Sequence, residues 1–209
     1  KTGSKESIIA HKALQKIKDM LHSGKNARDT ELSEEEIKEI KGLSLLTMKP
    51  VLYIANCSEE QLKNFETKEL KNNRKIDFIP ISAKVEEELN TLEETDKVEY
   101  LDSLGIKESG LNQLIREAYK ILGLITYFTS GEPETRAWTV KRNTKAPDAA
   151  GVIHTDFIKG FVKADVVDWK DFVAFGGWGE KLKESGKIKL VGKDYVIQDG
   201  DTVYFHISS

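Results

Sequence analysis

The chain has a single cysteine, Cys57, among 209 residues, so an internal disulfide framework and a cysteine-rich metal cluster are both excluded. Its four histidines are scattered without metal-ligand spacing, and no metal site is predicted. No apolar run reaches the roughly 18 residues that a membrane helix needs. A formal charge of -3 argues against a polyanion-binding chain as a whole. We therefore expect a cytoplasmic protein with no membrane or DNA partner.

The sequence also contains no phosphate-binding loop. The pattern G-x-x-x-x-G-K-[ST], whose backbone amides and lysine hold nucleotide phosphates, occurs nowhere in it. Two D-x-x-G strings, which begin at Asp102 and Asp148, lie in helical contexts and are interpreted as chance matches. No catalytic residue is therefore predicted. Because the chain begins at Lys1 rather than at a methionine, we expect a fragment of a longer protein.

Residues 1–48 form the first predicted domain. Apolar residues from Ile9 to Leu21 recur at three- and four-residue spacings, which predicts a helix. A polar stretch follows, and a capping box from Ser33 to Glu36 opens a second helix. The two helices predict a hairpin, either a short antiparallel coiled coil or an ordinary pair of surface helices.

Residues 49–125 form the second predicted domain. The continuous apolar run 49–55 is typical of a strand buried on both faces of a parallel sheet, and 77–81 is a second strand. A helix is predicted over 109–122 from its apolar spacing. Strands that alternate with helices indicate an α/β unit. The segment is too short for a complete doubly wound sheet, so half of that domain is expected to be missing.

Residues 126–209 form the third predicted domain, a compact α+β module. Its boundary is placed near 125–135, where residues 130–133 are interpreted as a linker. One helix is predicted over 146–157, with Pro147 acceptable in its first turn. The other predicted elements are strands and a closing β-hairpin, at 136–141, 161–167 and 188–190, and at 195–198 with 203–207.

Polar motifs follow both predicted strands of the second domain. Asn56 ends the first strand, and Ser82-Ala83-Lys84 follows the second. Ligands of open α/β sheets bind at the carboxyl ends of strands, so both motifs lie where a ligand would bind. An Asn amide offers a donor and an acceptor together, the pattern that pairs with a purine edge. The motifs predict a purine-base pocket, whereas Cys57, without a neighbouring base, is not expected to be a nucleophile.

The third domain carries a local surplus of positive charge. Its segment 136–163 contains only two acids, Asp148 and Asp156, against six cationic side chains: Arg136, Lys141, Arg142, Lys145, Lys159 and Lys163. Such a segment suits contact with RNA, although lysine-rich strand edges also serve to prevent edge-to-edge pairing. The three tryptophans, Trp138, Trp169 and Trp178, are expected to pack in or near the core rather than to stack on bases.

These strings carry a resemblance to a known family. The segments 136–142, 146–157 and 198–201 look like the TGS domain of the YchF/Obg-like ATPase family, and the string APDAAGVIHTDF is highly specific. Upstream, 49–56, the N-x-x-E motif from Asn56 to Glu59, and Ser82-Ala83-Lys84 are similar to the family's base-recognition strands. The helical hairpin resembles the second part of its coiled-coil insertion. The resemblance covers essentially the whole chain, in family order.

The resemblance implies a P-loop NTPase of the translation-factor class that prefers ATP to GTP and associates with ribosomes. It implies that 1–48 is part of a coiled-coil insertion, 49–125 the C-terminal half of a G-type domain, and 126–209 a β-grasp, ubiquitin-like TGS domain. The base-recognition residues would be Asn56, Cys57, Glu59, Ser82 and Ala83. The residues in contact with ribosomal RNA or protein would be Arg136, Lys141, Arg142 and Lys145. The intact protein would bind ATP or GTP with Mg²⁺. This chain alone is expected to be inactive, because the P-loop and switch regions would precede Lys1.

The family's N-x-x-E motif, in place of N-K-x-D, has a physical interpretation. The Asp of N-K-x-D accepts from guanine N1–H and the exocyclic amine, and adenine has no such donor pair there. Without that Asp, and with Cys57 in place of the Lys, Asn56 and the Cys57 backbone would recognise adenine, and Glu59 need not reach the base. The alternative for the whole chain is a stand-alone ribosome- or RNA-binding module without nucleotide chemistry.

Overall fold

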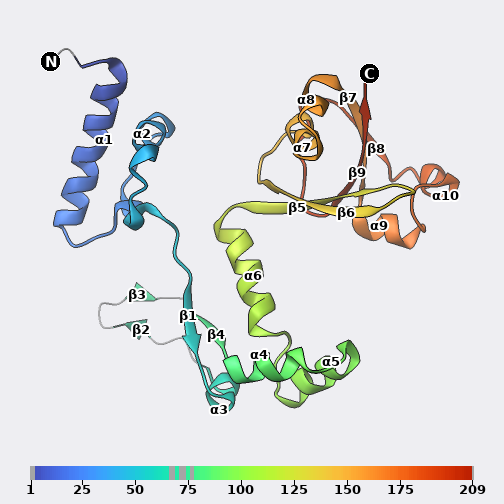
Figure 1. Cartoon of the computed structure of the whole chain (residues 1–209), viewed down its shortest axis with the longest axis horizontal. Helices are drawn as coiled ribbons and strands as arrows, with labels where there is room; N and C mark the ends of the chain where they lie inside the picture. Colours follow the sequence, from blue (N-terminus) through green and yellow to red (C-terminus); the bar gives the residue numbers. More distant parts are fainter. Residues whose placement is uncertain (1–2, 66–68, 71–73, 76–77, 209) are drawn as a thin grey trace. The chain divides into compact units, whose positions relative to one another are not determined.

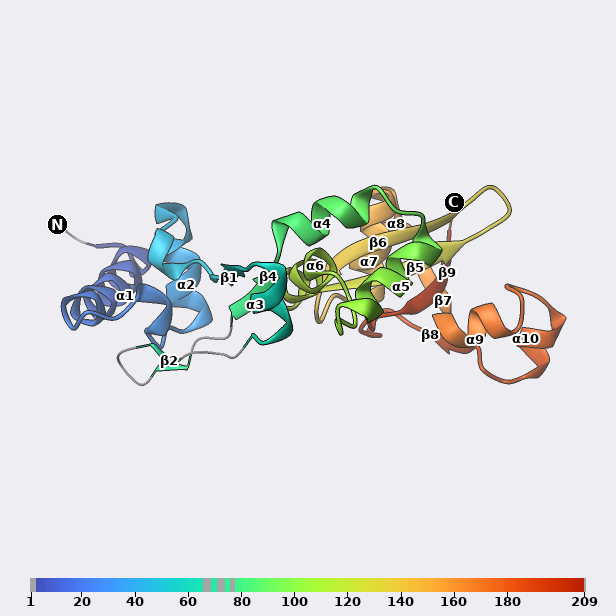
Figure 2. The same cartoon turned by 90° about the horizontal axis from the view of Figure 1, so that it is seen from below.

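The computed structural model describes residues 3–65, 69–70, 74–75 and 78–208 (Figures 1 and 2). The chain divides into two compact units, Lys1–Lys84 and Val85–Ser209. Both contain helices and strands, which confirms the predicted mixed α/β character. None of the helices in the described part of the chain combines the length and apolar composition needed to span a bilayer.

Two helices form the first part of the amino-terminal unit, α1 (Lys5–His22) and α2 (Glu34–Ile40). The predicted capping box is confirmed: Ser33 Oγ accepts from Glu36 N at 3.2 Å, and the Glu36 carboxylate accepts from Ser33 N at 2.9 Å. The helices pack around a small apolar cluster of Ala13, Ile17, Ala27 and Ile40. Three 3₁₀ turns complete this part, at Ala27–Asp29, Lys41–Leu43 and Leu46–Met48. That the pair belongs to a coiled-coil insertion stays a prediction.

The strands of the same unit are short. β1 (Tyr53–Asn56) pairs in parallel with β4 (Phe78–Ile81), which confirms a strand at each predicted place. The first strand is shorter than the predicted 49–55, because residues 49–52 are not part of it, and the predicted residue Asp77 lies outside the described residues. The elements between them are α3 (Glu59–Lys63) and the antiparallel pair β2 (Glu69–Leu70) and β3 (Arg74–Lys75).

The expectation that the first strand is buried on both faces is wrong for this chain. Tyr53 is 43% exposed and Ile54 is 48% exposed. Among the described strands, β1 and β4 pair only with each other. A sheet of two strands gives its apolar side chains few neighbours to pack against, so they stay exposed.

Three helices open the second unit, α4 (Ala83–Asn90), α5 (Glu94–Ser103) and α6 (Gly110–Ile121), the first of which begins just before the boundary. The helix predicted over 109–122 is confirmed as α6, and Ser109 caps it by accepting from Asn112 N at 3.1 Å. The Glu86 carboxylate accepts from Gly110 N at 2.7 Å and so joins the start of α6 to α4.

A five-stranded sheet with the order β6-β5-β9-β7-β8 dominates the second unit. Its strands are β5 (Leu124–Ser130), β6 (Thr135–Lys141), β7 (Phe161–Asp168), β8 (Lys189–Val191) and β9 (Asp201–Ile207). β5 and β9 are parallel, and the other pairs are antiparallel. The strands predicted at 136–141, 161–167 and 188–190 are therefore confirmed, with ends that differ by a residue.

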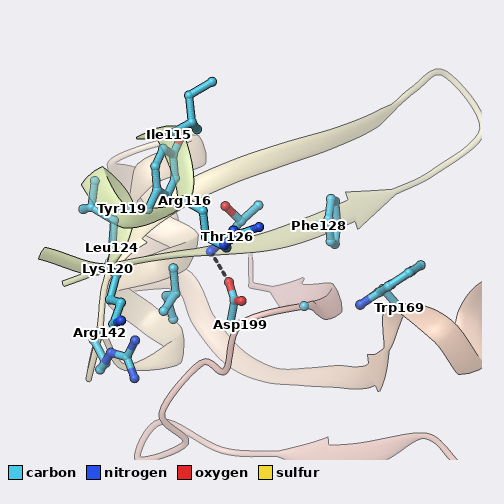
Figure 3. Close-up of a pocket in the computed structure, with 12 residues that line it drawn as sticks. Ile115, Arg116, Tyr119, Lys120, Leu124, Thr126, Phe128, Arg142, Trp169 and Asp199 are labelled. Carbon is cyan, nitrogen blue, oxygen red and sulfur yellow. Dashed lines mark hydrogen bonds between the residues drawn. The ribbon is translucent and has the colours of Figure 1, made fainter. Parts of the chain in front are cut away.

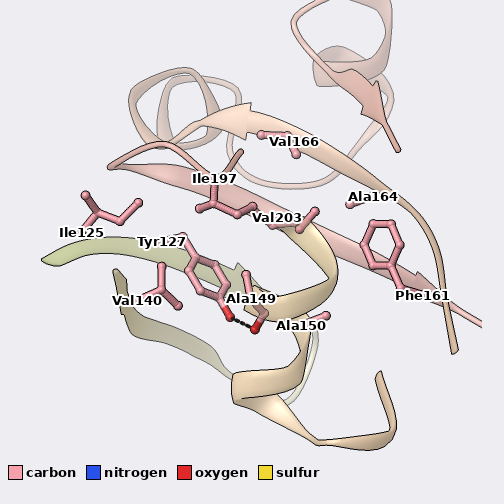
Figure 4. Close-up of a cluster of buried hydrophobic side chains, with 11 residues drawn as sticks. Ile125, Tyr127, Val140, Ala149, Ala150, Phe161, Ala164, Val166, Ile197 and Val203 are labelled. Atoms are coloured by element: carbon pink, nitrogen blue, oxygen red, sulfur yellow. Dashed lines mark hydrogen bonds between the residues drawn. The ribbon is translucent and has the colours of Figure 1, made fainter. Parts of the chain in front are cut away.

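The core of this unit lies between α7 (Ala146–Ile153) and one face of the sheet, called the inner face (Figure 4). Tyr127 from β5 is fully buried there and donates from its hydroxyl to the Ala149 carbonyl of α7 at 2.8 Å. The buried cluster comprises Ile125, Tyr127, Val140, Ala146, Ala149, Ala150, Phe161, Ala164, Val166, Ile197 and Val203. Because side chains alternate along a strand, Thr126 and Phe128 lie on the opposite, outer face.

Three sequence predictions for this unit are wrong: the linker at 130–133, the closing hairpin, and the single helix over 146–157. Residues 130–133 are not a linker: Ser130 ends β5, and residues 131–133 belong to the turn between β5 and β6, where Gly131 N donates to Glu134 O at 3.0 Å. Residues 195–198 do not form a hairpin with 203–207; Val196 makes an isolated bridge to Lys145, whereas β9 pairs with β7 and β5.

The helix predicted over 146–157 is two helices, α7 and α8 (Asp156–Gly160). The chain is extended at His154, with φ -154° and ψ 134°, which ends α7. Gly151 permits the turn back, because a Cβ there would lie 2.4 Å from Cγ1 of Ile158 on α8. The remaining helices of the unit are α9 (Trp169–Ala174) and α10 (Glu180–Glu184).

Candidate functional site

The polar motifs of the first unit meet at one edge of the β1–β4 sheet. Asn56 is in register with Ile81, so the carboxyl ends of the two parallel strands are adjacent, and Cys57 N donates to Ile81 O at 2.8 Å. An open hollow of about 590 Å³ lies at this edge and is lined by Asn56, Cys57, Ser58, Glu59, Glu60, Lys63, Ser82, Ala83 and Lys84. The structure thus brings together all five residues that the sequence analysis proposed for base recognition.

The helix α3 begins directly at this hollow. Ser58 caps it in a capping box with Gln61: Ser58 Oγ accepts from Gln61 N at 3.3 Å, and Gln61 Oε1 accepts from Ser58 N at 2.9 Å. Glu59, at the first helical position, forms an ion pair with Lys63 at 3.3 Å. The Glu59 carboxylate therefore has a partner on its own helix.

The hydrogen-bonding groups available in the hollow differ in part from those that the sequence analysis proposed for base recognition. Asn56 is exposed and offers both amide donors and a carbonyl acceptor. The Cys57 N–H is committed to Ile81 O, so only the Cys57 carbonyl remains for a base contact. Ser82 is 2% exposed, which keeps its side chain in the interior, whereas Ala83 is exposed at the start of α4.

Sequence reasoning did not assign Glu60 and Lys63 to this hollow. The S-x-x-Q string from Ser58 to Gln61 was a signal for them, because it predicts a helix start immediately after the strand. Among the described residues, no group of three or more His, Cys, Asp or Glu side chains is arranged to hold a metal ion.

The four residues proposed for RNA contact do not share one surface. Lys141, Arg142 and Lys145 lie at the corner between β6 and α7. Arg136 lies near the other end of β6, with its guanidinium 4.3 Å from the Trp138 ring centroid. Lys145 forms an ion pair with Asp194 at 2.8 Å, and the hydrogen bond to that carboxylate raises the pKa of Lys145. Asp194, which lies outside the segment 136–163, thus neutralises part of the positive charge that the sequence analysis counted in that segment.

The second unit has its own pocket, of about 630 Å³, between α6 and the outer face of the sheet (Figure 3). Arg142 lines it, and so does Trp169, which the sequence analysis interpreted as a packing residue but which is 45% exposed. No spacing in the sequence pointed to this pocket, because its walls come from α6, β5, α9 and the turn before β9.

Comparison with known proteins identifies relatives over the whole chain. The family model YchF-GTPase_C, described as a protein of unknown function (DUF933), matches residues 124–208. The ribosome-binding ATPase YchF of Bacillus subtilis is 43% identical over 215 residues, and that of Haemophilus influenzae is 42% identical over 212. Each match covers 100% of this chain but 58% of the relative, so the chain spans little more than half the length of these relatives.

Solved structures agree with these matches. The Schizosaccharomyces pombe YchF GTPase superposes with a TM-score of 0.79 at 34% identity, over 99% of this chain and 57% of that one. A GTP binding protein from Pyrococcus horikoshii OT3 is similar in fold, with a TM-score of 0.52 at 20% identity over 93% of this chain and 56% of that one. The chain therefore belongs to the YchF family, as the resemblance of its sequence motifs had predicted.

Proposed function

We propose that the chain is part of a ribosome-associated, nucleotide-binding ATPase and that its strand-end hollow holds the purine base. The observation that carries this proposal is the convergence of Asn56 and Ala83 on one open hollow at the carboxyl ends of two parallel strands. The Bacillus and Haemophilus relatives are named ribosome-binding ATPases, and the superposed yeast structure is titled a GTPase.

A preference for ATP over GTP follows from the groups that remain available in the hollow. The Cys57 carbonyl can accept from the 6-amino group of adenine, whereas O6 of guanine would place two acceptors against each other. Asn56 supplies the complementary donor for a ring nitrogen. Glu59 is paired with Lys63, so its carboxylate is not committed to the two guanine donors.

The residues present fit a base better than they fit a triphosphate. An exposed amide and strand-end backbone groups suit a purine edge, but the sequence has no Walker A loop to hold the phosphates. The phosphates and Mg²⁺ would be bound by parts of the intact protein beyond these 209 residues. This chain would then orient the nucleotide without supplying a catalytic group.

The remaining domains fit a docking role. The sheet order β6-β5-β9-β7-β8, with α7 on its inner face, supports the assignment of 126–209 as a β-grasp TGS domain. The helices α1 and α2 support a hairpin from a coiled-coil insertion within 1–48, which leaves 49–125 as the C-terminal half of a G-type domain. The basic corner of Lys141, Arg142 and Lys145 would contact ribosomal RNA or protein, in the cytoplasm.

The second candidate function is a stand-alone ribosome- or RNA-binding module without nucleotide chemistry. The missing phosphate-binding loop favours it for the 209 residues alone. Binding of ATP by the protein extended to the full length of its relatives separates the two candidates.

Calorimetric titration of that extended protein with ATP is the test of the base pocket. Asn56→Ala is expected to weaken ATP binding by about 0.5–1.5 kcal/mol, the value of one hydrogen bond to the base. Cys57→Ala is the matched control, because the neighbouring residue would contribute its backbone carbonyl only. Equal affinities of wild type and Asn56→Ala would remove Asn56 from the site.

Co-sedimentation with ribosomes over a range of salt concentrations is the test of docking. Lys141→Ala/Arg142→Ala is expected to weaken binding most at low salt, with a slope of log affinity against log salt smaller by about 0.7–0.9 for each lost phosphate contact. Lys183→Ala, which removes an exposed cation on α10, away from the basic corner, is the control for net charge. An unchanged slope in the folded double variant would assign these charges to solubility or edge protection.

A further inference from the structure

The pocket of the second unit combines flat aromatic rings with cations. Figure 3 shows Phe128 and Trp169 at one end and Lys120 and Arg142 at the other. The hydrogen bond from Thr126 N to Asp199 Oδ1, at 2.8 Å, lies between the two ends. A volume of about 630 Å³ is within the range of pockets that take small organic ligands. The pocket thus has an end suited to stacking and an end suited to an anion.

Trp169 is held in place by the turn before β9. Trp169 N donates to Gly200 O at 3.0 Å, and Gly200 N donates to Thr126 O at 2.8 Å, which fixes the turn to β5. Gly200 has φ +87°, and a Cβ there would lie 2.7 Å from Cδ1 of Trp169. The indole therefore rests directly against the glycine backbone, while 45% of the residue stays exposed. Lys170 Nζ lies 5.8 Å from the centroid of the same ring, at the end of a long side chain that a base can displace. A ring that rests against backbone and stays partly exposed is a surface on which a base can stack.

Arg142 is the cation best placed to bind an anion. Arg116 is paired with Glu108, and Lys120 with Glu117 at 3.3 Å. Arg142 is exposed and has no acidic partner among the residues that the structure describes. Its backbone N donates to Gly123 O at 2.7 Å, so the position of the residue is fixed while its side chain is available.

A separate group of aromatic rings involves α9 and β9 and does not include Trp169. Phe172 lies three residues along α9 and contacts Trp178 at a centroid distance of 5.2 Å. Trp178 contacts Tyr204 at 6.2 Å, and Tyr204 contacts His206 at 5.1 Å. Tyr204 is 51% exposed on β9.

We infer that this pocket binds single-stranded RNA, with one unstacked base on Trp169 and a phosphate farther along the same strand at Arg142. This inference rests on the proposed ribosome association and names the RNA strand that the second unit would contact. Stacking on aromatic rings combined with backbone contacts to cations is how proteins bind single strands. A duplex does not fit, because its bases are stacked and paired and cannot enter a pocket. The Asp199 carboxylate in the middle favours a phosphate at the Arg142 end.

The test is titration of the 209-residue chain with a 12-nucleotide single-stranded RNA, followed by tryptophan fluorescence. Wild type is expected to bind with quenching, and Trp169→Ala to bind about five- to 150-fold more weakly, the range measured for loss of one stacked base. Val173→Ala, at an exposed position of the same helix, is the matched control. Trp169→Leu keeps apolar packing against Gly200 but removes the flat ring, so it should lose affinity even if the alanine variant unfolds.

Arg142→Gln is expected to lower the slope of log affinity against log salt by about 0.7, the value for one single-strand phosphate contact. Lys183→Gln, at an exposed position of α10 that does not line the pocket, is expected to leave the slope unchanged. Wild-type affinity in folded Trp169→Leu would overturn the inference. Equal affinity for uridine monophosphate and for the RNA would also overturn it in favour of a free nucleotide. If ribosome binding persists while RNA binding ignores Trp169, only this inference fails. If RNA binding depends on Trp169 but the chain does not bind ribosomes, only the proposed ribosome association fails.

Discussion

Tyr127→Phe removes the hydroxyl that joins the sheet of the second unit to α7. That hydroxyl is fully buried and donates to Ala149 O at 2.8 Å. The variant keeps the aromatic ring and its edge contact with Phe205, at a centroid distance of 6.0 Å. The loss is therefore that of one buried hydrogen bond, about 0.5–1.5 kcal/mol. In a unit of this size, about 1 kcal/mol corresponds to a fall in Tm of about 4 °C.

The pH dependence gives the same prediction a second test. Burial raises the pKa of Tyr127 above its usual value of 10.0. The neutral phenol is thus favoured in the folded state, and the wild type loses this stability as the pH rises above 10, where the unfolded chain ionises. Tyr127→Phe has no such loss, so the gap in stability between wild type and variant should narrow at alkaline pH.

Urea unfolding followed by circular dichroism, at pH 7 and above pH 10, measures both effects. Tyr204→Phe is the matched control, because Tyr204 is 51% exposed and its hydroxyl has no hydrogen bond among the described residues. The reasoning is refuted if the two variants have the same free energy of unfolding at pH 7. It is also refuted if the gap between wild type and Tyr127→Phe stays constant with pH.

Three further predictions concern other parts of the chain. The Glu36 carboxylate accepts from Lys16 and from Ser33 N, which lowers its pKa below 4.5. The ionised Glu36 carboxylate therefore stabilises the folded chain above pH 4.5, and this stability is lost as the pH falls. Acid titration followed by the circular dichroism of the helices should show this loss in wild type but not in Glu36→Gln. Gly151→Ala should cost about 1–3 kcal/mol in chemical unfolding by forcing Ile158 away, and Ile158→Ala in the same chain should recover part of it. The 209-residue chain should release no phosphate from ATP in a steady-state assay, and turnover that persists through purification would contradict the absence of a phosphate-binding loop.

Those parts of the fold that depend on neighbouring residues were predictable from the sequence. Ser33 and Ser109 cap their helices as their local motifs indicate, because a cap is decided by four consecutive residues. The strand at Val196 was assigned to a hairpin because the turn after it has suitable residues. In the structure Val196 instead bridges to Lys145. Strand pairing over such distances is decided by packing of the whole sheet, which a local turn signal does not contain.

The two pockets differ in how far the sequence could reveal them. The strand-end hollow was predictable, because Asn56 and Ser82 each follow a strand and a general rule places the ends of parallel strands together. The pocket at Trp169 depends on Gly200, on Thr126 and on a helix more than fifty residues earlier, and no rule of spacing connects them. The sequence analysis also assigned Trp169 to packing, because the sequence does not distinguish a tryptophan buried in the core from one that is exposed beside a pocket. What distinguishes Trp169 is that a glycine with positive φ supports its ring while 45% of the residue stays exposed, and that combination exists only in the folded chain.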